Sequence, residues 1–190
     1  YTQDTSNDHT QVGGSNSGNG VQKVGAKFVG SGHSAVGETF NQVTVRMMLP
    51  WTTSSDYEIP MKVWDSSGNV VAESETTVTL QDLPSGWQSD GSDEFVYTFA
   101  TSYTLGANDI IGVDPAGGTN DVDSFTFRGQ FTNIVSDFEF SVYTPNQGGW
   151  GNGNGFQNYD PWIIIDFNET ITTTGISTPI NTLDGALDEI

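Results

Sequence analysis

The chain has 190 residues, of which 34% are hydrophobic and 15% charged, which suits one domain with a real core better than two. Its 24 acidic residues against five basic ones give a formal charge of −19, which argues against nucleic acid as a partner because phosphate recognition needs a patch of Lys and Arg. The chain contains no cysteine, which excludes disulfides, zinc–thiolate sites and a cysteine nucleophile, and no run of about 18 apolar residues predicts a membrane span.

The first segment is almost entirely polar. Residues 1–20 contain one aliphatic side chain, Val12. Such a segment is expected to be disordered in water by itself, so we predict an N-terminal tail that a neighbouring molecule orders. Because the chain opens on Tyr1 rather than on Met, removal of a secretory signal is the expected processing, which predicts an extracellular or cell-surface protein.

From residue 21 onward, apolar residues recur with a period of two, which is typical of strands. NQVTVRMML, for example, places Val43, Val45, Met47 and Leu49 on one face. Apolar runs separated by Gly, Asn, Asp and Ser predict nine strands. These strands are 21–29, 41–49, 57–65, 70–80, 93–101, 108–114, 124–131, 138–144 and 161–174.

The third and fourth of these strands are joined by SSGN, which predicts a hairpin with a glycine turn. Pro60 inside the first of the two predicts either an edge strand or a bulge, because proline cannot donate a ladder hydrogen bond. No segment has a convincing helical period. The sequence therefore predicts an all-β fold, a single jelly-roll-type antiparallel β-sandwich over residues 21–168 with extended N- and C-terminal tails.

Several stretches carry a resemblance to a known kind of domain. They are VGAKFVGSG (24–32), NQVTVRMML (41–49), MKVWDSSGNVVAES (61–74) and FVYTFATSYTLGANDIIGVDPAGG (95–118). Residues 21–131 resemble the jelly-roll β-sandwich domains that occur, often in tandem, in large secreted surface proteins of archaea and some bacteria. The resemblance implies a fold like that of carbohydrate-binding modules and no agreed catalytic residues. This chain departs from the pattern in its single copy and its two tails.

Two acidic loops have the composition of calcium sites. Ca²⁺ takes about six to eight oxygen ligands, which closely spaced carboxylates, amides and carbonyls on a curled turn can supply. The candidate ligands are Asp90, Asp93 and Glu94 in SDGSDEF, and Asn120, Asp121 and Asp123 in GTNDVDSF. The alternative is that both loops are solvated turns that end strands. A bound calcium ion is the one cofactor that the sequence suggests.

A third feature is GGWGNGNGFQNYDPW, residues 148–162, in which large aromatic side chains interrupt a run of Gly and Asn. Trp150, Phe156 and Tyr159 have three open interpretations. They pack on their own domain, they contact another subunit, or they form a platform for a sugar.

The C-terminal segment 169–190 begins Thr/Ile-rich and ends acidic. Its first half can form an extra strand in which Ile171, Ile176 and Ile180 would enter a groove on a neighbouring subunit. We therefore expect a secreted structural subunit that assembles with itself into a filament or a cell-surface layer by strand donation, stabilised by calcium. The alternative is a calcium-dependent carbohydrate-binding or adhesin module, with cell-surface glycans as partners.

Catalysis finds little support in the sequence. The chain has two histidines, His9 in the polar tail and His33 in a turn, and no GxSxG motif. Carboxylate pairs occur, but 24 acidic residues in 190 produce pairs by chance. We expect a protein that is not an enzyme.

Overall fold

The computed structural model describes nine stretches of the chain, and the elements below belong to them. The stretches are 9–12, 23–28, 30–49, 56–86, 88–115, 125–130, 138–144, 149–151 and 160–167. They form twelve strands and one 3-10 turn. In chain order these are β1 (His9–Val12), β2 (Lys23–Phe28), β3 (Thr39–Met48), β4 (Glu58–Trp64), β5 (Val70–Thr79), the 3-10 turn η1 (Leu80–Asp82), β6 (Glu94–Thr104), β7 (Ile110–Val113), β8 (Phe125–Gln130), β9 (Phe138–Thr144), β10 (Gly149–Gly151), β11 (Asp160–Pro161) and β12 (Ile163–Phe167).

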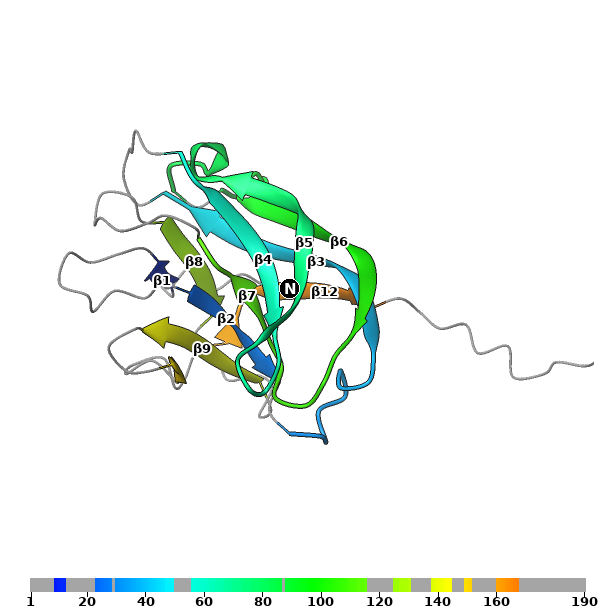
Figure 1. The fold of residues 1–190 in the computed structure, drawn as a ribbon. Coiled ribbons are helices and arrows are strands. Elements are labelled where there is room, and N and C mark those ends of the chain that lie inside the picture. Colours follow the sequence, from blue (N-terminus) through cyan, green and yellow to red (C-terminus); the bar gives the residue numbers. More distant parts are fainter. Residues whose placement is uncertain are drawn as a thin grey trace, which may run out of the picture.

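The strands form two antiparallel sheets that lie face to face (Figure 1). The first sheet has the order β1-β8-β3-β12, with β6 also paired to β3 and β11 also paired to β8. The second sheet has the order β10-β9-β2-β7-β4-β5. The prediction of an all-β antiparallel sandwich is therefore confirmed, while the more specific jelly-roll connectivity stays a prediction.

The core lies between the sheets and comes from alternate positions of their strands. Val43, Val45 and Met47 of β3 are fully buried, as the period of two predicts. The second sheet contributes inward residues such as Met61 and Val63. Each of the nine predicted strands overlaps a strand of the structure, although the last predicted range, 161–174, is described only as far as residue 167.

The predicted hairpin is β4–β5, and Pro60 forms a bulge in it. β4 lies between β7 and β5, so it is not an edge strand. The register shifts between Pro60 and Lys62, and the amide of Met61 donates to Ser74 Oγ at 3.1 Å. The side chain of Ser74 thus replaces the ladder partner that the bulge removes, which explains how proline is accommodated inside a sheet.

The two predicted tails are described only in part. Residues 9–12 form β1, which pairs with β8 of the same chain from His9↔Arg128 to Val12↔Phe125. This stretch of the predicted tail therefore joins the chain's own first sheet. The rest of residues 1–20 lies outside the described residues, and so does the whole segment 169–190.

Candidate functional site

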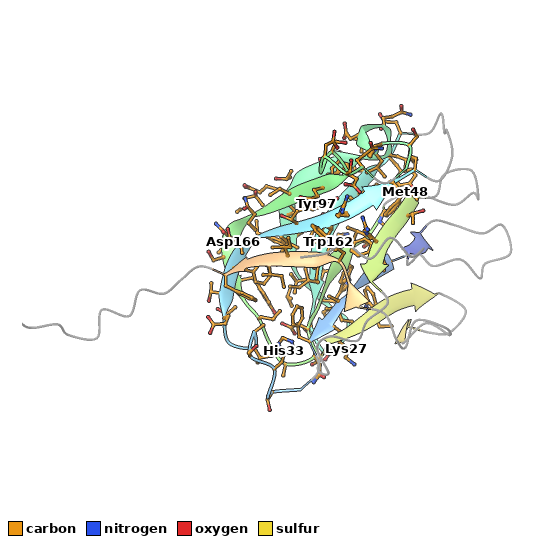
Figure 2. The ribbon with its side chains drawn as sticks, turned by 180° about the vertical axis from the view of Figure 1, so that it is seen from behind. Lys27, His33, Met48, Tyr97, Trp162 and Asp166 are labelled. Atoms are coloured by element: carbon orange, nitrogen blue, oxygen red, sulfur yellow. The ribbon has the colours of Figure 1, made fainter. Side chains whose placement is uncertain are left out.

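The most accessible feature of the fold is the free edge of β12. β12 pairs with β3 from Ile163↔Val45 to Phe167↔Phe40, and its other edge has no strand partner among the residues that the structure describes. β12 lies in the rear layer in Figure 1 and in front in Figure 2, where Trp162 and Asp166 are labelled along it.

The side chains of β12 are strongly apolar for a strand at an edge. Ile164 points away from the core and is 53% exposed. Ile163, Ile165 and Phe167 pack against the core but remain only half-buried. A strand of this kind presents unpaired amide and carbonyl groups together with apolar surface, which is a template for pairing with another strand.

The other described edges are shorter or guarded. β1 and β10 have four and three residues. β5 carries the exposed acids Glu73 and Glu75, and charged side chains on an edge oppose pairing. β6 lies beside β5, where the Thr98 amide donates to Thr76 Oγ1 at 3.3 Å. β12 is thus the described edge with the least protection.

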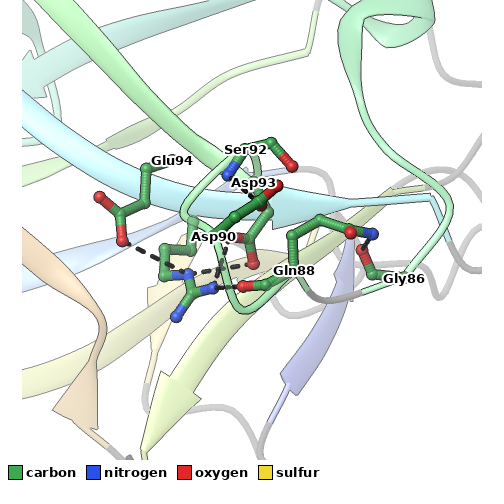
Figure 3. Close-up of polar contacts among 7 residues, drawn as sticks. Gly86, Gln88, Asp90, Ser92, Asp93 and Glu94 are labelled. Atoms are coloured by element: carbon green, nitrogen blue, oxygen red, sulfur yellow. Dashed lines mark hydrogen bonds and ion pairs between the residues drawn. The ribbon is translucent and has the colours of Figure 1, made fainter.

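The first acidic loop is organised around a buried ion pair (Figure 3). Arg46 of β3 is 1% exposed, and Asp93 is fully buried. Arg46 Nε donates to Asp93 Oδ2 at 3.0 Å, and Arg46 Nη2 donates to Asp93 Oδ1 and to the carbonyl of Gln88. Both carboxylate oxygens of Asp93 are therefore taken by a guanidinium in the geometry that arginine and carboxylate prefer.

The neighbouring acids of this loop lie closer to the surface. Asp90 Oδ1 accepts the Ser92 amide at 3.0 Å, and the hydrogen bonds of Ser92 hold the pKa of Asp90 below its usual value. Glu94 Oε1 lies 3.9 Å from Arg46 Nε. Within this loop the Arg46 guanidinium therefore binds both carboxylate oxygens of Asp93, while Asp90 and Glu94 lie closer to the surface.

The calcium prediction concerns two loops, and the structure describes only the first of them. Asn120, Asp121 and Asp123 lie outside the described residues. Within the described part of the chain, no group of three or more His, Cys, Asp or Glu side chains is placed to hold a metal ion. A calcium ion bound at this protein stays a prediction.

Among the three aromatic candidates, Trp150 is the one whose surroundings are described. Its ring meets that of Trp64 edge-on, with centroids 4.7 Å apart. Trp64 is almost fully buried, and Lys23 Nζ lies 5.5 Å from the centroid of its ring. This contact agrees with packing of Trp150 on its own domain, while Phe156 and Tyr159 lie outside the described residues.

Beside these tryptophans, two lysines share one carboxylate. Lys23 Nζ and Lys62 Nζ lie 3.3 and 3.0 Å from Asp114 Oδ2. The three side chains come from β2, β4 and the end of β7, which are neighbours in the second sheet. The pairs lock these strands together on a partly exposed surface, where an ion pair contributes at most about 1 kcal/mol.

The sequence analysis missed two residues of the candidate site, Arg46 and Ile164. The predicted donor residues Ile171, Ile176 and Ile180 lie outside the described residues. The burial of Arg46 was missed because the alternation of NQVTVRMML predicts only that Arg46 faces outward. Ile164 was missed as an edge residue, although the uniform run WIIIDF, without polar alternation, was a usable signal.

Among the described residues no helix is long and apolar enough to cross a membrane. Comparisons of the chain with protein families, with curated proteins and with solved structures found no match. The resemblance to secreted surface-protein domains therefore stays a prediction.

Proposed function

We propose that this protein is a secreted structural subunit that assembles with itself into an extracellular filament or a cell-surface layer by strand addition, with a jelly-roll-type sandwich as its body. The observation that carries the proposal is the unpaired, apolar edge of β12, with Ile164 53% exposed. An edge of this kind is an aggregation hazard unless a specific strand covers it.

The occupant that we assign to this edge is the segment 169–180 of a second copy. The segment follows directly on β12 and reads ETITTTGISTPI, rich in the β-branched residues that strands favour. Ile176 and Ile180 are four residues apart and so fall on one face of a strand, whereas Ile171 falls on the other. Main-chain hydrogen bonds along the edge would add about 0.5–1.5 kcal/mol each, and the isoleucines would cover Ile163 and Ile165.

In the proposed assembly each subunit is both a donor and an acceptor. Donation from one subunit to the next is a head-to-tail contact, which does not close on itself unless the rotation between subunits closes a ring. Filaments or layers are the expected products. The lack of cysteine is consistent with an extracellular protein whose cohesion comes from assembly, and calcium at the Asp121 and Asp123 loop remains part of the proposal.

The test separates the two halves of the contact. Ile164→Lys places a charge on the acceptor edge, and a chain ending at Asn168 lacks the donor. Each variant alone is expected to remain monomeric by size-exclusion chromatography and negative-stain electron microscopy, where the wild type forms polymers. Val71→Lys, at a 44% exposed position of β5, is the matched control and is expected to assemble as the wild type does.

Mixing the variants gives a sharper result. The Ile164→Lys chain keeps its donor and the truncated chain keeps its acceptor, so together they are expected to form dimers but no polymers. Monomeric wild-type protein at every concentration would refute the proposal. A wild-type monomer that is destabilised by the truncation would show instead that residues 169–180 cover β12 of their own chain.

A further inference from the structure

The backbone of β3 shows which residues of β12 turn their hydrogen-bonding groups to the free edge. The amide of Met47 donates to the carbonyl of Asp93 at 3.0 Å, so the backbone groups of Met47 face the side of β3 on which β6 lies. Backbone groups alternate between the two edges of a strand, so those of Thr44 face the other side, where Thr44 pairs with Ile164 of β12. Ile164 therefore bonds to β3, and the residues on either side of it direct their N–H and C=O groups to the free edge.

Those two neighbours of Ile164 are also residues whose side chains face the core. Ile163 and Ile165 pack against the core and are half-buried, whereas Ile164 between them is 53% exposed. A strand added at this edge must bond to the backbone of Ile163 and Ile165 and also cover their side chains. The direction of the added strand decides which of its residues can do both.

Antiparallel and parallel strands differ in this respect. In an antiparallel pair, two opposite residues whose side chains share a face both turn their backbone groups toward each other or both turn them away. In a parallel pair, only one of the two residues turns its groups toward the other, because reversing a strand reverses the edge to which the residues of one face point. A residue that covers the core beside Ile163 can therefore bond directly to Ile163 only in an antiparallel strand.

Proline shows which edge of the donor segment suits β12. Pro179 has no N–H, so it fits an added strand best where its backbone groups point away from β12. Those of Thr178 and Ile180 then point toward β12. Ile180 is also one of the two isoleucines, with Ile176, whose side chains fall on one face and are assigned to the core side. The residues that bond to β12 and the residues that cover the core are thus the same, which is the property of an antiparallel strand.

One register of the antiparallel pair matches apolar residues with apolar ones at both ends. Its opposite pairs are Ile180↔Ile163, Pro179↔Ile164, Thr178↔Ile165, Ser177↔Asp166 and Ile176↔Phe167. The ring of Pro179 would lie beside Ile164, which is the most exposed large hydrophobic residue of the described chain. A parallel strand with the same isoleucines over β12 would instead put Pro179 beside Asp166 and turn its missing N–H toward β12.

This reasoning rests on the proposed strand addition and gives it a direction. We infer that the donor strand of a second copy runs antiparallel to β12 in this register, with Pro179 on its outer edge. The new outer edge then lacks an N–H donor, and proline at an edge opposes further pairing. Each acceptor edge takes one strand and is protected afterwards, so growth continues from subunit to subunit without lateral extension of the sheet.

Disulfide cross-linking tests the direction and the register, because the chain contains no cysteine of its own. The acceptor chain ends at Asn168 and carries one cysteine in β12, and the donor chain carries Ile164→Lys and one cysteine in the segment 169–180. The cysteine replacements are Ile163→Cys or Phe167→Cys in the acceptor and Ile176→Cys or Ile180→Cys in the donor. Opposite residues that exchange hydrogen bonds have Cα atoms about 5.5 Å apart, which a disulfide spans.

Cross-linked heterodimers on a non-reducing gel are expected from two of the four mixtures, those that join residue 163 to 180 and residue 167 to 176. Cross-links that join 163 to 176 and 167 to 180 would show a parallel strand and overturn the inference, while the strand addition itself would stand. No cross-link in any mixture would overturn both. An acceptor that carries Val71→Cys, at an exposed position of β5, is the matched control and is expected to give none.

A full-length chain that carries both Ile163→Cys and Ile180→Cys distinguishes a second copy from the same chain. A ladder of cross-linked multimers is expected. A cross-linked monomer would refute donation between subunits.

Pro179→Val tests the protected outer edge, because valine restores the missing N–H. Its polymers are expected to associate laterally, with wider filaments by negative-stain electron microscopy and stronger light scattering. Thr178→Val is the matched control, since the backbone groups of Thr178 face β12, and it is expected to leave the filament width unchanged. Filaments of equal width from the two variants would overturn the assignment of Pro179 to the outer edge.

Discussion

The buried pair of Arg46 and Asp93 allows a quantitative prediction. Asp93→Ala removes the acceptor of two hydrogen bonds from Arg46 and leaves the guanidinium with the carbonyl of Gln88 and with Glu94 at 3.9 Å. With Arg46 1% and Asp93 0% exposed, water cannot replace the lost carboxylate without opening the loop. Removing one partner of such a pair costs about 3–5 kcal/mol.

That cost is a large part of the stability of a domain of this size, which is about 5–15 kcal/mol. The expected fall in Tm is about 6–20 °C, because 1 kcal/mol corresponds to about 2–4 °C in domains of 150–250 residues. Urea denaturation followed by circular dichroism measures the free energy of unfolding, and calorimetry measures Tm. An unchanged m-value would show that the variant unfolds from the same compact state.

The double variant Arg46→Met/Asp93→Ala distinguishes the cost of leaving Arg46 buried without its carboxylate from the cost of lost packing at residue 93. Replacing both charges by apolar groups is expected to bring the free energy of unfolding back to within about 1–2 kcal/mol of the wild type. The reasoning is refuted if Asp93→Ala costs less than about 1 kcal/mol. It is equally refuted if the double variant is less stable than Asp93→Ala alone.

Two further predictions concern the sheets and the tyrosines. In Gly112→Ala the new Cβ would overlap the carbonyl oxygen of Val24 and lie 2.5 Å from Gly25 Cα, so we expect a loss of about 3 kcal/mol in urea denaturation. The control is a second glycine-to-alanine change, at residue 32, where nothing lies within 4 Å, and it should be neutral. Burial raises the pKa of Tyr97 and of Tyr103 above the ordinary 10.0, and for Tyr103 the hydrogen bond to Asp109 adds to this. The stabilisation from these phenols is complete below pH 10 and is lost as the pH rises above it, because the unfolded chain ionises first. Phenolate absorbance should therefore show Tyr97 and Tyr103 ionising only as the strand signal in circular dichroism disappears, and complete ionisation of the tyrosines with the fold intact would contradict this.

Period-two alternation was sufficient to predict the central strands, because each has one face in the core and the other turned outward. NQVTVRMML predicted three of the inward residues of β3, Val43, Val45 and Met47, whereas Leu49 lies just beyond the strand and is only half-buried. β1 and β10 could not be found this way. HTQV and GWG have no apolar alternation. They form strands because each pairs with the edge of a longer strand, β1 with β8 and β10 with β9. Their structure depends on tertiary context rather than on their own sequence.

The burial of side chains on the outward faces of the sheets was the other property that could not be predicted from the sequence. Alternation assigns Trp64 and Arg46 to the outside of their sheets, yet both are 1% exposed. Trp64 is covered in part by Trp150, which lies more than 80 residues away in the chain. Arg46 is covered by the turn that precedes β6 and by Trp162. Such coverage depends on which distant segments fold over a strand, which a single sequence does not encode in its local pattern.

The charge of the chain bears on where two copies can meet. A chain with a formal charge of −19 repels other copies of itself, and this repulsion acts over about 8–10 Å at physiological salt. A contact built on surface carboxylates would have to neutralise them, whereas β12 contributes one acid, Asp166, among three isoleucines and a phenylalanine. Main-chain hydrogen bonds and apolar side chains are insensitive to the net charge. In the proposed assembly, β12 is therefore the described edge at which strand addition would meet the least electrostatic opposition.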